Sequence, residues 1–119
     1  MKTAILHYAT PPVVGGVEAV IQAHAVQFAA AGLPLTVISG RGQADALPDG
    51  VDFIRIAELD TLHPLIAAAT TELNAGKLPG NFEELTNNLY AQLRPILPQF
   101  DNVIIHNVLT KHFNLPLTA

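Results

Sequence analysis

Two adjacent glycines, Gly15 and Gly16, separate a proline-containing turn from a helical pattern that begins at Val17. Glycine lets a ligand approach the backbone without meeting a Cβ, and the free N–H groups of a helix N-terminus attract anions. We therefore expect an anion or sugar-phosphate site at residues 14–18, with Gly15, Gly16, Val17 and Glu18 as its contacts. Two structural explanations stay open: glycine also serves tight turns, and a carboxylate such as Glu18 is stabilised in the first turn of any helix.

A second candidate group stands at the end of the last predicted strand, residues 102–106. His106 ends that strand, and Asn107 follows it. Ligands of open α/β sheets bind beyond the carboxyl ends of the strands. We therefore predict a functional role for His106 and a ligand contact for Asn107.

The other residues that could do chemistry have simpler explanations. His7, in a buried strand, and His24, on the expected buried stripe of the first helix, are predicted to be hydrogen-bonded core histidines. His63, before a proline at a helix start, is predicted to cap the helix or lie on the surface. A metal site of His106, His112 and a distant carboxylate such as Asp101 is rejected because no ligand motif supports it. Arg41 could contact a phosphate, but a solvated loop arginine is the preferred interpretation.

These candidates require an alternating series of elements. Strands are predicted at 3–9, 35–38, 51–57 and 102–106, the third nearer the sheet edge and the last buried. Helices are predicted at 17–31, 62–75 and 82–97, and Pro95 should end or kink the third. The first helix is expected to bury Val17, Val20, Ile21, His24, Phe28 and Ala31. Alternation of this kind indicates an α/β, Rossmann-like parallel sheet with helices on both faces, with the loops at 10–16, 39–42 and 106–110 on one surface.

Composition sets further limits. The chain has 119 residues, which we interpret as one domain; half are apolar and 13% are charged, which excludes a disordered protein. The net charge is −4 and the basic residues are scattered, so nucleic acid is not an expected partner. There is no cysteine. The N-terminus is unlike a signal peptide, and no apolar run is long enough to span a membrane, so a cytoplasmic protein is predicted.

Two segments together resemble a known family. The strand followed by Gly15-Gly16-Val17-Glu18, a helix ending Phe28-Ala29-Ala30-Ala31-Gly32-Leu33, and Thr36-Val37-Ile38-Ser39-Gly40 resemble the N-terminal domain of family 4 glycosyltransferases. The segment Asp101–Val108 resembles the same family's strand that ends in a histidine. The likeness covers nearly all of the chain. It implies the front half of a GT-B architecture, in which two Rossmann-like domains face each other across a cleft.

The resemblance implies roles for particular residues. Gly15 and Gly16 would approach the donor phosphates and the acceptor, and His106 would lie near the transferred sugar as the catalytic residue. Transfer would be retaining, with no cofactor, and stabilisation of the leaving diphosphate would matter most. The partners would be a nucleotide-sugar donor and a sugar or lipid-linked acceptor, which is compatible with a position at the inner membrane face.

The sequence also departs from that family. The basic residues and spaced glutamates of the donor domain are absent, and residues 110–119 read as the opening of a helix that is cut off. We therefore expect a fragment that is inactive by itself, and a homodimer formed through an exposed interdomain or edge surface. A stand-alone α/β binding or interaction module remains the alternative. A dinucleotide-binding oxidoreductase is disfavoured because residues 10–18 lack the GxGxxG spacing.

Overall fold

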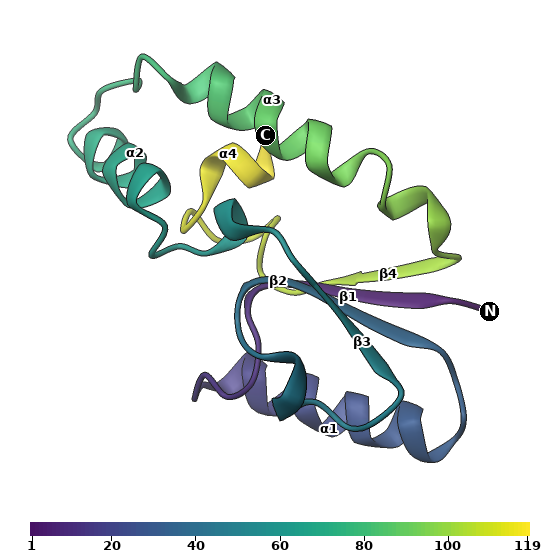
Figure 1. Ribbon diagram of the computed structural model, residues 1–119. Coiled ribbons are helices and arrows are strands. Elements are labelled where there is room, and N and C mark those ends of the chain that lie inside the picture. Colours follow the sequence, from purple (N-terminus) through teal and green to yellow (C-terminus); the bar gives the residue numbers. More distant parts are fainter.

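The computed structural model describes residues 1–119 and contains one four-stranded parallel sheet. Its strands are β1 (Thr3–Ala9), β2 (Leu35–Arg41), β3 (Val51–Arg55) and β4 (Asn102–Ile105). The first helix, α1 (Gly16–Ala30), covers one face. The other face carries α2 (Pro64–Asn74), α3 (Phe82–Leu93) and α4 (Leu115–Thr118) (Figure 1). The predicted Rossmann-like α/β fold is confirmed.

The strand order is β3-β2-β1-β4. From β1 the chain moves outward through β2 to β3, and it then returns to the other side of β1 as β4. Leu6 of β1 is level with both Ile38 of β2 and Ile105 of β4. The direction of winding therefore reverses between β1 and β4, and such a switch point opens a crevice at the carboxyl ends of the strands.

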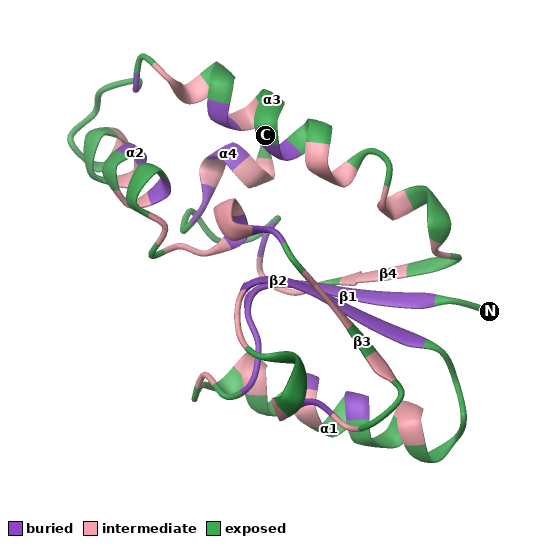
Figure 2. Ribbon diagram, viewed as in Figure 1, coloured by how far each residue is buried: buried purple, intermediate pink, exposed green.

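The core follows the two-residue alternation of β1. Leu6 and Tyr8 point to the face of α3 and pack in one cluster with Leu89. Ile5 points to the opposite face and packs with Ile21 of α1. Burying an aliphatic side chain of this size contributes about 1.5–3 kcal/mol. The central strands are buried over most of their length, whereas β3 and β4 are only half-buried (Figure 2). The same alternation directs His7 toward α1.

The buried face of α1 differs from the predicted one. Val20, His24 and Ala31 are exposed, and the fully buried residues are Ile21 and Ala25. The prediction that His24 is a core histidine was wrong. Apolar residues occur all around this helix, so its pattern does not define a single stripe.

The two edges of the sheet were predicted with different success. The expected edge position of 51–57 is confirmed, although β3 ends at Arg55 because Ala57–Leu59 form a 3₁₀ turn. The prediction that 102–106 is a buried strand was wrong: β4 lies at the other edge, and Ile105 is 44% exposed. A continuous apolar run indicates a strand, but it does not say how many neighbours that strand has.

The element boundaries follow local signals. α3 ends at Leu93, just before Pro95, as predicted. His63 caps α2, because its Nδ1 atom accepts a hydrogen bond from the Leu65 N–H at 3.2 Å. The helix expected within 110–119 is limited to α4, whose N-cap Asn114 accepts a hydrogen bond from the Leu117 N–H. None of the helices has the length and apolar character needed to cross a membrane.

Candidate functional site

A cavity of about 350 Å³ lies at the carboxyl ends of the strands, and we call it the carboxyl-edge cavity. It is lined by the end of β1 (His7–Ala9), the start of α1 (Gly16–Glu18), Arg41, Thr61, Asn107 and Phe113. The loops at 10–16, 39–42 and 106–110 were expected on one surface. Each of them contributes a residue to the cavity lining: Gly16, Arg41 and Asn107. The structure therefore brings segments about 100 residues apart in sequence to one place.

Four of the predicted site residues line this cavity: Gly16, Val17, Glu18 and Asn107. The other two, Gly15 and His106, adjoin lining residues in the chain but do not line the cavity themselves. The first turn of α1 and the exit from β4 thus face a common space. The ligand contacts predicted for Gly15 and His106 remain predictions.

The two glycines differ in what surrounds them. A Cβ on Gly15 would collide with the Oε2 atom of Glu18, whereas a Cβ on Gly16 would meet no atom within 4 Å. Gly15 therefore makes room for the Glu18 carboxylate, and Gly16 borders open space. The first hydrogen bond of α1 runs from the Ala19 N–H to the Gly15 carbonyl at 3.0 Å. The N–H groups before it, from Gly16 to Glu18, are left for a ligand or water.

His7 connects the two halves of the site. Its side chain is buried, its Nδ1 atom lies 3.2 Å from the His106 carbonyl oxygen, and its Nε2 atom lies 3.5 Å from Oε1 of Glu18. The prediction of a hydrogen-bonded core histidine is confirmed, but the contact with Glu18 was missed. The side-chain alternation of β1 could have indicated the contact with Glu18, because it directs His7 to the face of the sheet that α1 covers.

The chain turns sharply after β4. The Val108 N–H donates to the His106 carbonyl oxygen at 2.8 Å, and the residue between them, Asn107, has a φ of +65°. This three-residue turn is of the rare, strained kind, and asparagine is among the few residues that tolerate a positive φ. Strained backbone of this kind is concentrated at functional sites.

Buried polar atoms without a hydrogen-bond partner gather around this end of the sheet. Four of the six such side-chain atoms are near it: Tyr8 OH, Thr10 Oγ1, Arg41 Nε and His106 Nε2. Burial raises the pKa of Tyr8, so this phenol keeps its proton. Burial, together with repulsion from His7 and His24, lowers the pKa of His106 and favours its neutral imidazole. Unpaired buried groups of this kind need an explanation, and a ligand supplies one.

Arg41 corrects another prediction. It is the last residue of β2 rather than part of a solvated loop, and it lines the cavity. Its Nε atom lies 3.7 Å from Oδ1 of Asp60, and its side chain is 40% exposed, so solvent screens this pair. β2 extends beyond the predicted residues because Ala9 and Arg41 still pair across the sheet. The lining residues Thr61 and Phe113 were not predicted, since no strand fixes the paths of their loops.

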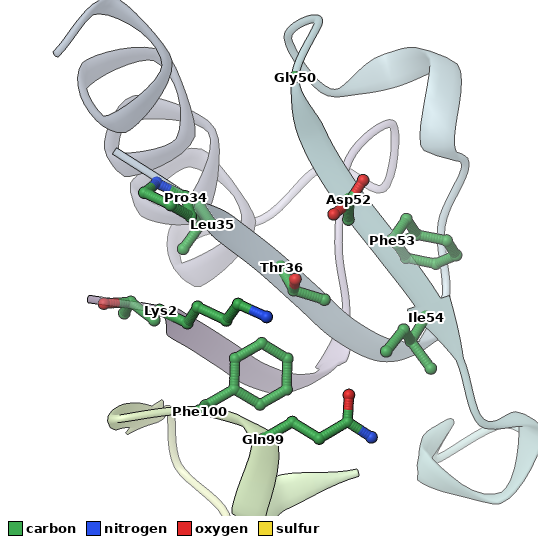
Figure 3. Close-up of a pocket in the computed structure, with 11 residues that line it drawn as sticks. Lys2, Pro34, Leu35, Thr36, Gly50, Asp52, Phe53, Ile54, Gln99 and Phe100 are labelled. Atoms are coloured by element: carbon green, nitrogen blue, oxygen red, sulfur yellow. The ribbon is translucent and has the colours of Figure 1, made fainter. Parts of the chain in front are cut away.

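A second, larger cavity lies at the opposite end of the sheet, and we call it the amino-edge cavity. It encloses about 440 Å³ and is lined by strand starts and the segment before β4, including Lys2, Thr36, Asp52, Gln99 and Phe100. The ring of Phe100 lies between Lys2 and Gln99 (Figure 3). None of the unpartnered buried atoms belongs to its lining residues. The amino-edge cavity is therefore larger, but no buried polar side-chain atom of its lining lacks a hydrogen-bond partner.

Comparison with protein-family models, with curated proteins and with solved structures gives no match to this chain. The family 4 resemblance therefore stays a prediction from the residues that carry it. The structure also contains no group of three or more histidine, aspartate or glutamate side chains placed to hold a metal ion.

Proposed function

We propose that this chain is the acceptor-side domain of a nucleotide-sugar-dependent glycosyltransferase of the retaining type. The observation that supports this best is the set of unpartnered polar groups around the carboxyl-edge cavity, where the glycine turn of α1 and the exit from β4 meet. An acceptor-side domain supplies only half of such a site. Residues 1–119 alone are therefore expected to be inactive.

The groups at the cavity suit a ligand rich in hydroxyls. The Glu18 carboxylate accepts hydrogen bonds, the Asn107 amide both donates and accepts, and the free N–H of Gly16 suits a phosphate or hydroxyl oxygen. In the proposed reaction the acceptor oxygen bonds to the sugar carbon, the bond from that carbon to the diphosphate breaks, and the acceptor proton leaves with the diphosphate. The contribution of this domain is to orient the acceptor.

His106 is the proposed catalytic residue. Its lowered pKa keeps the imidazole neutral at physiological pH, so it can exchange hydrogen bonds with a sugar hydroxyl without adding charge. Its Nε2 atom is buried, has no partner and lies outside the cavity lining. The role therefore requires this atom to become accessible when donor and acceptor bind.

The test is a transfer assay on the protein at the length that its gene encodes, with a panel of nucleotide sugars and glycoside acceptors. We expect transfer that His106→Ala abolishes and that Gly16→Val strongly reduces. Thr36→Val, at the amino-edge cavity, is the matched control and should leave transfer unchanged. A folded protein with neither transfer nor nucleotide-sugar affinity would contradict the proposal and favour a stand-alone α/β binding module.

A homodimer remains part of the proposal. β4 has an unpaired outer edge without charged residues, and Ile105 is 44% exposed there. Edges of this kind pair readily with another chain. Light scattering at high protein concentration should detect a dimer that Ile105→Lys weakens. A monomer at all concentrations would contradict this part.

A further inference from the structure

The hydrogen-bond partners of His7 determine where its protons lie. The partner of Nδ1 is the His106 carbonyl oxygen at 3.2 Å, and a carbonyl oxygen only accepts hydrogen bonds. Nδ1 must therefore carry a proton for this contact to form. In a neutral ring with that proton, Nε2 has only a lone pair to offer.

The second ring nitrogen faces another acceptor. Nε2 lies 3.5 Å from Oε1 of Glu18, and an ionised carboxylate also only accepts. Without a proton between them, the two atoms would present lone pairs to each other. Protonation of Nε2 turns this contact into an ion pair. The side chains of His7 and Glu18 are only 5% and 14% exposed, so solvent screens the pair less than a surface pair.

Both partners of His7 belong to the candidate site. The His106 carbonyl oxygen also accepts the hydrogen bond from the Val108 N–H that closes the turn at Asn107. On the other side, Glu18 places its second oxygen, Oε2, where a side chain on Gly15 would lie. The His7 ring thus holds the turn after β4 and the first turn of α1 in fixed positions.

We infer that His7 is a positioning residue that fixes Glu18 and Asn107 relative to each other, with one proton on each ring nitrogen. The inference deepens the proposed function, and it rests on that function only for what the two residues bind. Glu18 is the one carboxylate in contact with the ring. The other polar or charged groups near the ring are Tyr8 beside it in β1, Ser39 opposite it in β2, His106 at the exit from β4, and the Arg41–Asp60 pair at the cavity.

The experiment records the ring-nitrogen NMR signals of the histidines in ¹⁵N-labelled protein as the pH is raised. We expect His7 to carry protons on both nitrogens, one for each of its two acceptors. The backbone amide signals of Glu18 and Asn107 should change together wherever the Nε2 proton is absent. Glu18→Gln should leave one proton, on Nδ1, because the glutamine amide donates to Nε2.

Glu84→Gln is the matched control. Glu84 is the third residue of α3, as Glu18 is of α1, but it is exposed and has no histidine partner. It should leave the His7 signals unchanged. A neutral His7 ring over the whole pH range, or one protonated only on Nε2, would overturn the inference, as would equal effects of the two glutamine variants.

The wild-type spectrum decides the question even where a variant fails to fold. The outcome is also separate from that of the transfer assay. A doubly protonated His7 in a protein that transfers no sugar would contradict the proposed function and leave the link between Glu18 and Asn107 intact. Sugar transfer by a protein with a neutral His7 would support the proposed function and contradict the role of His7 in linking Glu18 to Asn107.

Discussion

The carboxyl-edge and amino-edge cavities lie at opposite ends of the sheet and differ in chemistry more than in size. The amino-edge cavity is the larger, at about 440 Å³, but its charged residues Lys2 and Asp52 are exposed to solvent. The carboxyl-edge cavity, at about 350 Å³, is bordered by a strained turn, a buried histidine and polar atoms without partners. Unsatisfied groups indicate a binding site better than volume does, because an unpaired buried group carries an energetic penalty that a ligand relieves.

The parallel topology explains the difference. Each strand of a parallel sheet leads, at its carboxyl end, into a loop and then a helix N-terminus, where free N–H groups lie. Here β1 leads to Gly16 and β4 leads to the turn at Asn107. The amino ends receive chain from the preceding segments and have no helix N-terminus directed at them. Matched substitutions at the two ends of the sheet test whether only the carboxyl ends bind a ligand.

The largest expected effect is that of Gly16→Val on ligand binding. A side chain at Gly16 enters open space beside the cavity, so it should block a ligand while changing stability little. We expect a loss of affinity of about tenfold or more, equivalent to at least about 1.4 kcal/mol. Calorimetric titration of the bound sugar measures it. Equal weakening by Thr36→Val at the amino edge would remove the distinction between the cavities.

Asn107→Ala should affect both stability and binding. Alanine at φ +65° costs about 1–2 kcal/mol, and the amide contact to the ligand is lost. Asn107→Gly should recover most of the stability but not the affinity. Gly50→Ala, at φ +88° beside the amino-edge cavity, should reduce the free energy of unfolding to a similar extent. Denaturant unfolding and ligand titration of the three variants separate the effects; a loss of affinity in Gly50→Ala would count against the assignment.

Tyr8→Phe should have a smaller effect of opposite sign on stability. It removes a buried hydroxyl that lacks a partner, so the free energy of unfolding should stay the same or rise by about 1 kcal/mol. Ligand affinity should fall, because the hydroxyl is then missing. Thr86→Val removes an equivalent orphan hydroxyl in α3, away from the cavity, and should leave affinity unchanged. Reduced stability with unaltered binding in Tyr8→Phe would contradict this.

The smallest expected effect is in the pH dependence of stability. The pKa of His106 is lowered in the folded protein, so the unfolded chain binds this proton more readily. The stability associated with the neutral ring is therefore present above the ordinary value of 6.5 and is lost as the pH falls below it. His106→Gln should flatten this part of the stability profile, whereas His112→Gln, at an exposed position, should not. The same pH dependence of the free energy of unfolding in both variants would contradict this assignment to His106.

The sequence predicted the architecture better than the burial. Strand and helix order, the position of β3 at an edge and the end of α3 before Pro95 were all indicated by local signals. The buried face of α1 was not indicated by its own pattern, because apolar residues on every side hide its packing face. The exposure of β4 was not indicated by its residues either, because the number of neighbours of a strand depends on the topology of the sheet.

The same limit applies to the candidate site. Gly16, Glu18 and Asn107 were found because loops at the carboxyl ends of parallel strands share an edge. The contact between His7 and Glu18 depends on the side of β1 that α1 covers, and no pattern within either segment states it. The unpartnered Tyr8 hydroxyl depends on the packing of the whole domain.

Ligand binding at the carboxyl-edge cavity is tested directly by titrating the ¹⁵N-labelled chain with acceptor sugars and nucleotide sugars and following the backbone amide signals. We expect saturable shifts at Gly16, Glu18 and Asn107, with Lys2, Thr36 and Asp52 unchanged. Shifts confined to the amino-edge residues would contradict it, as would the absence of shifts with every ligand of the panel.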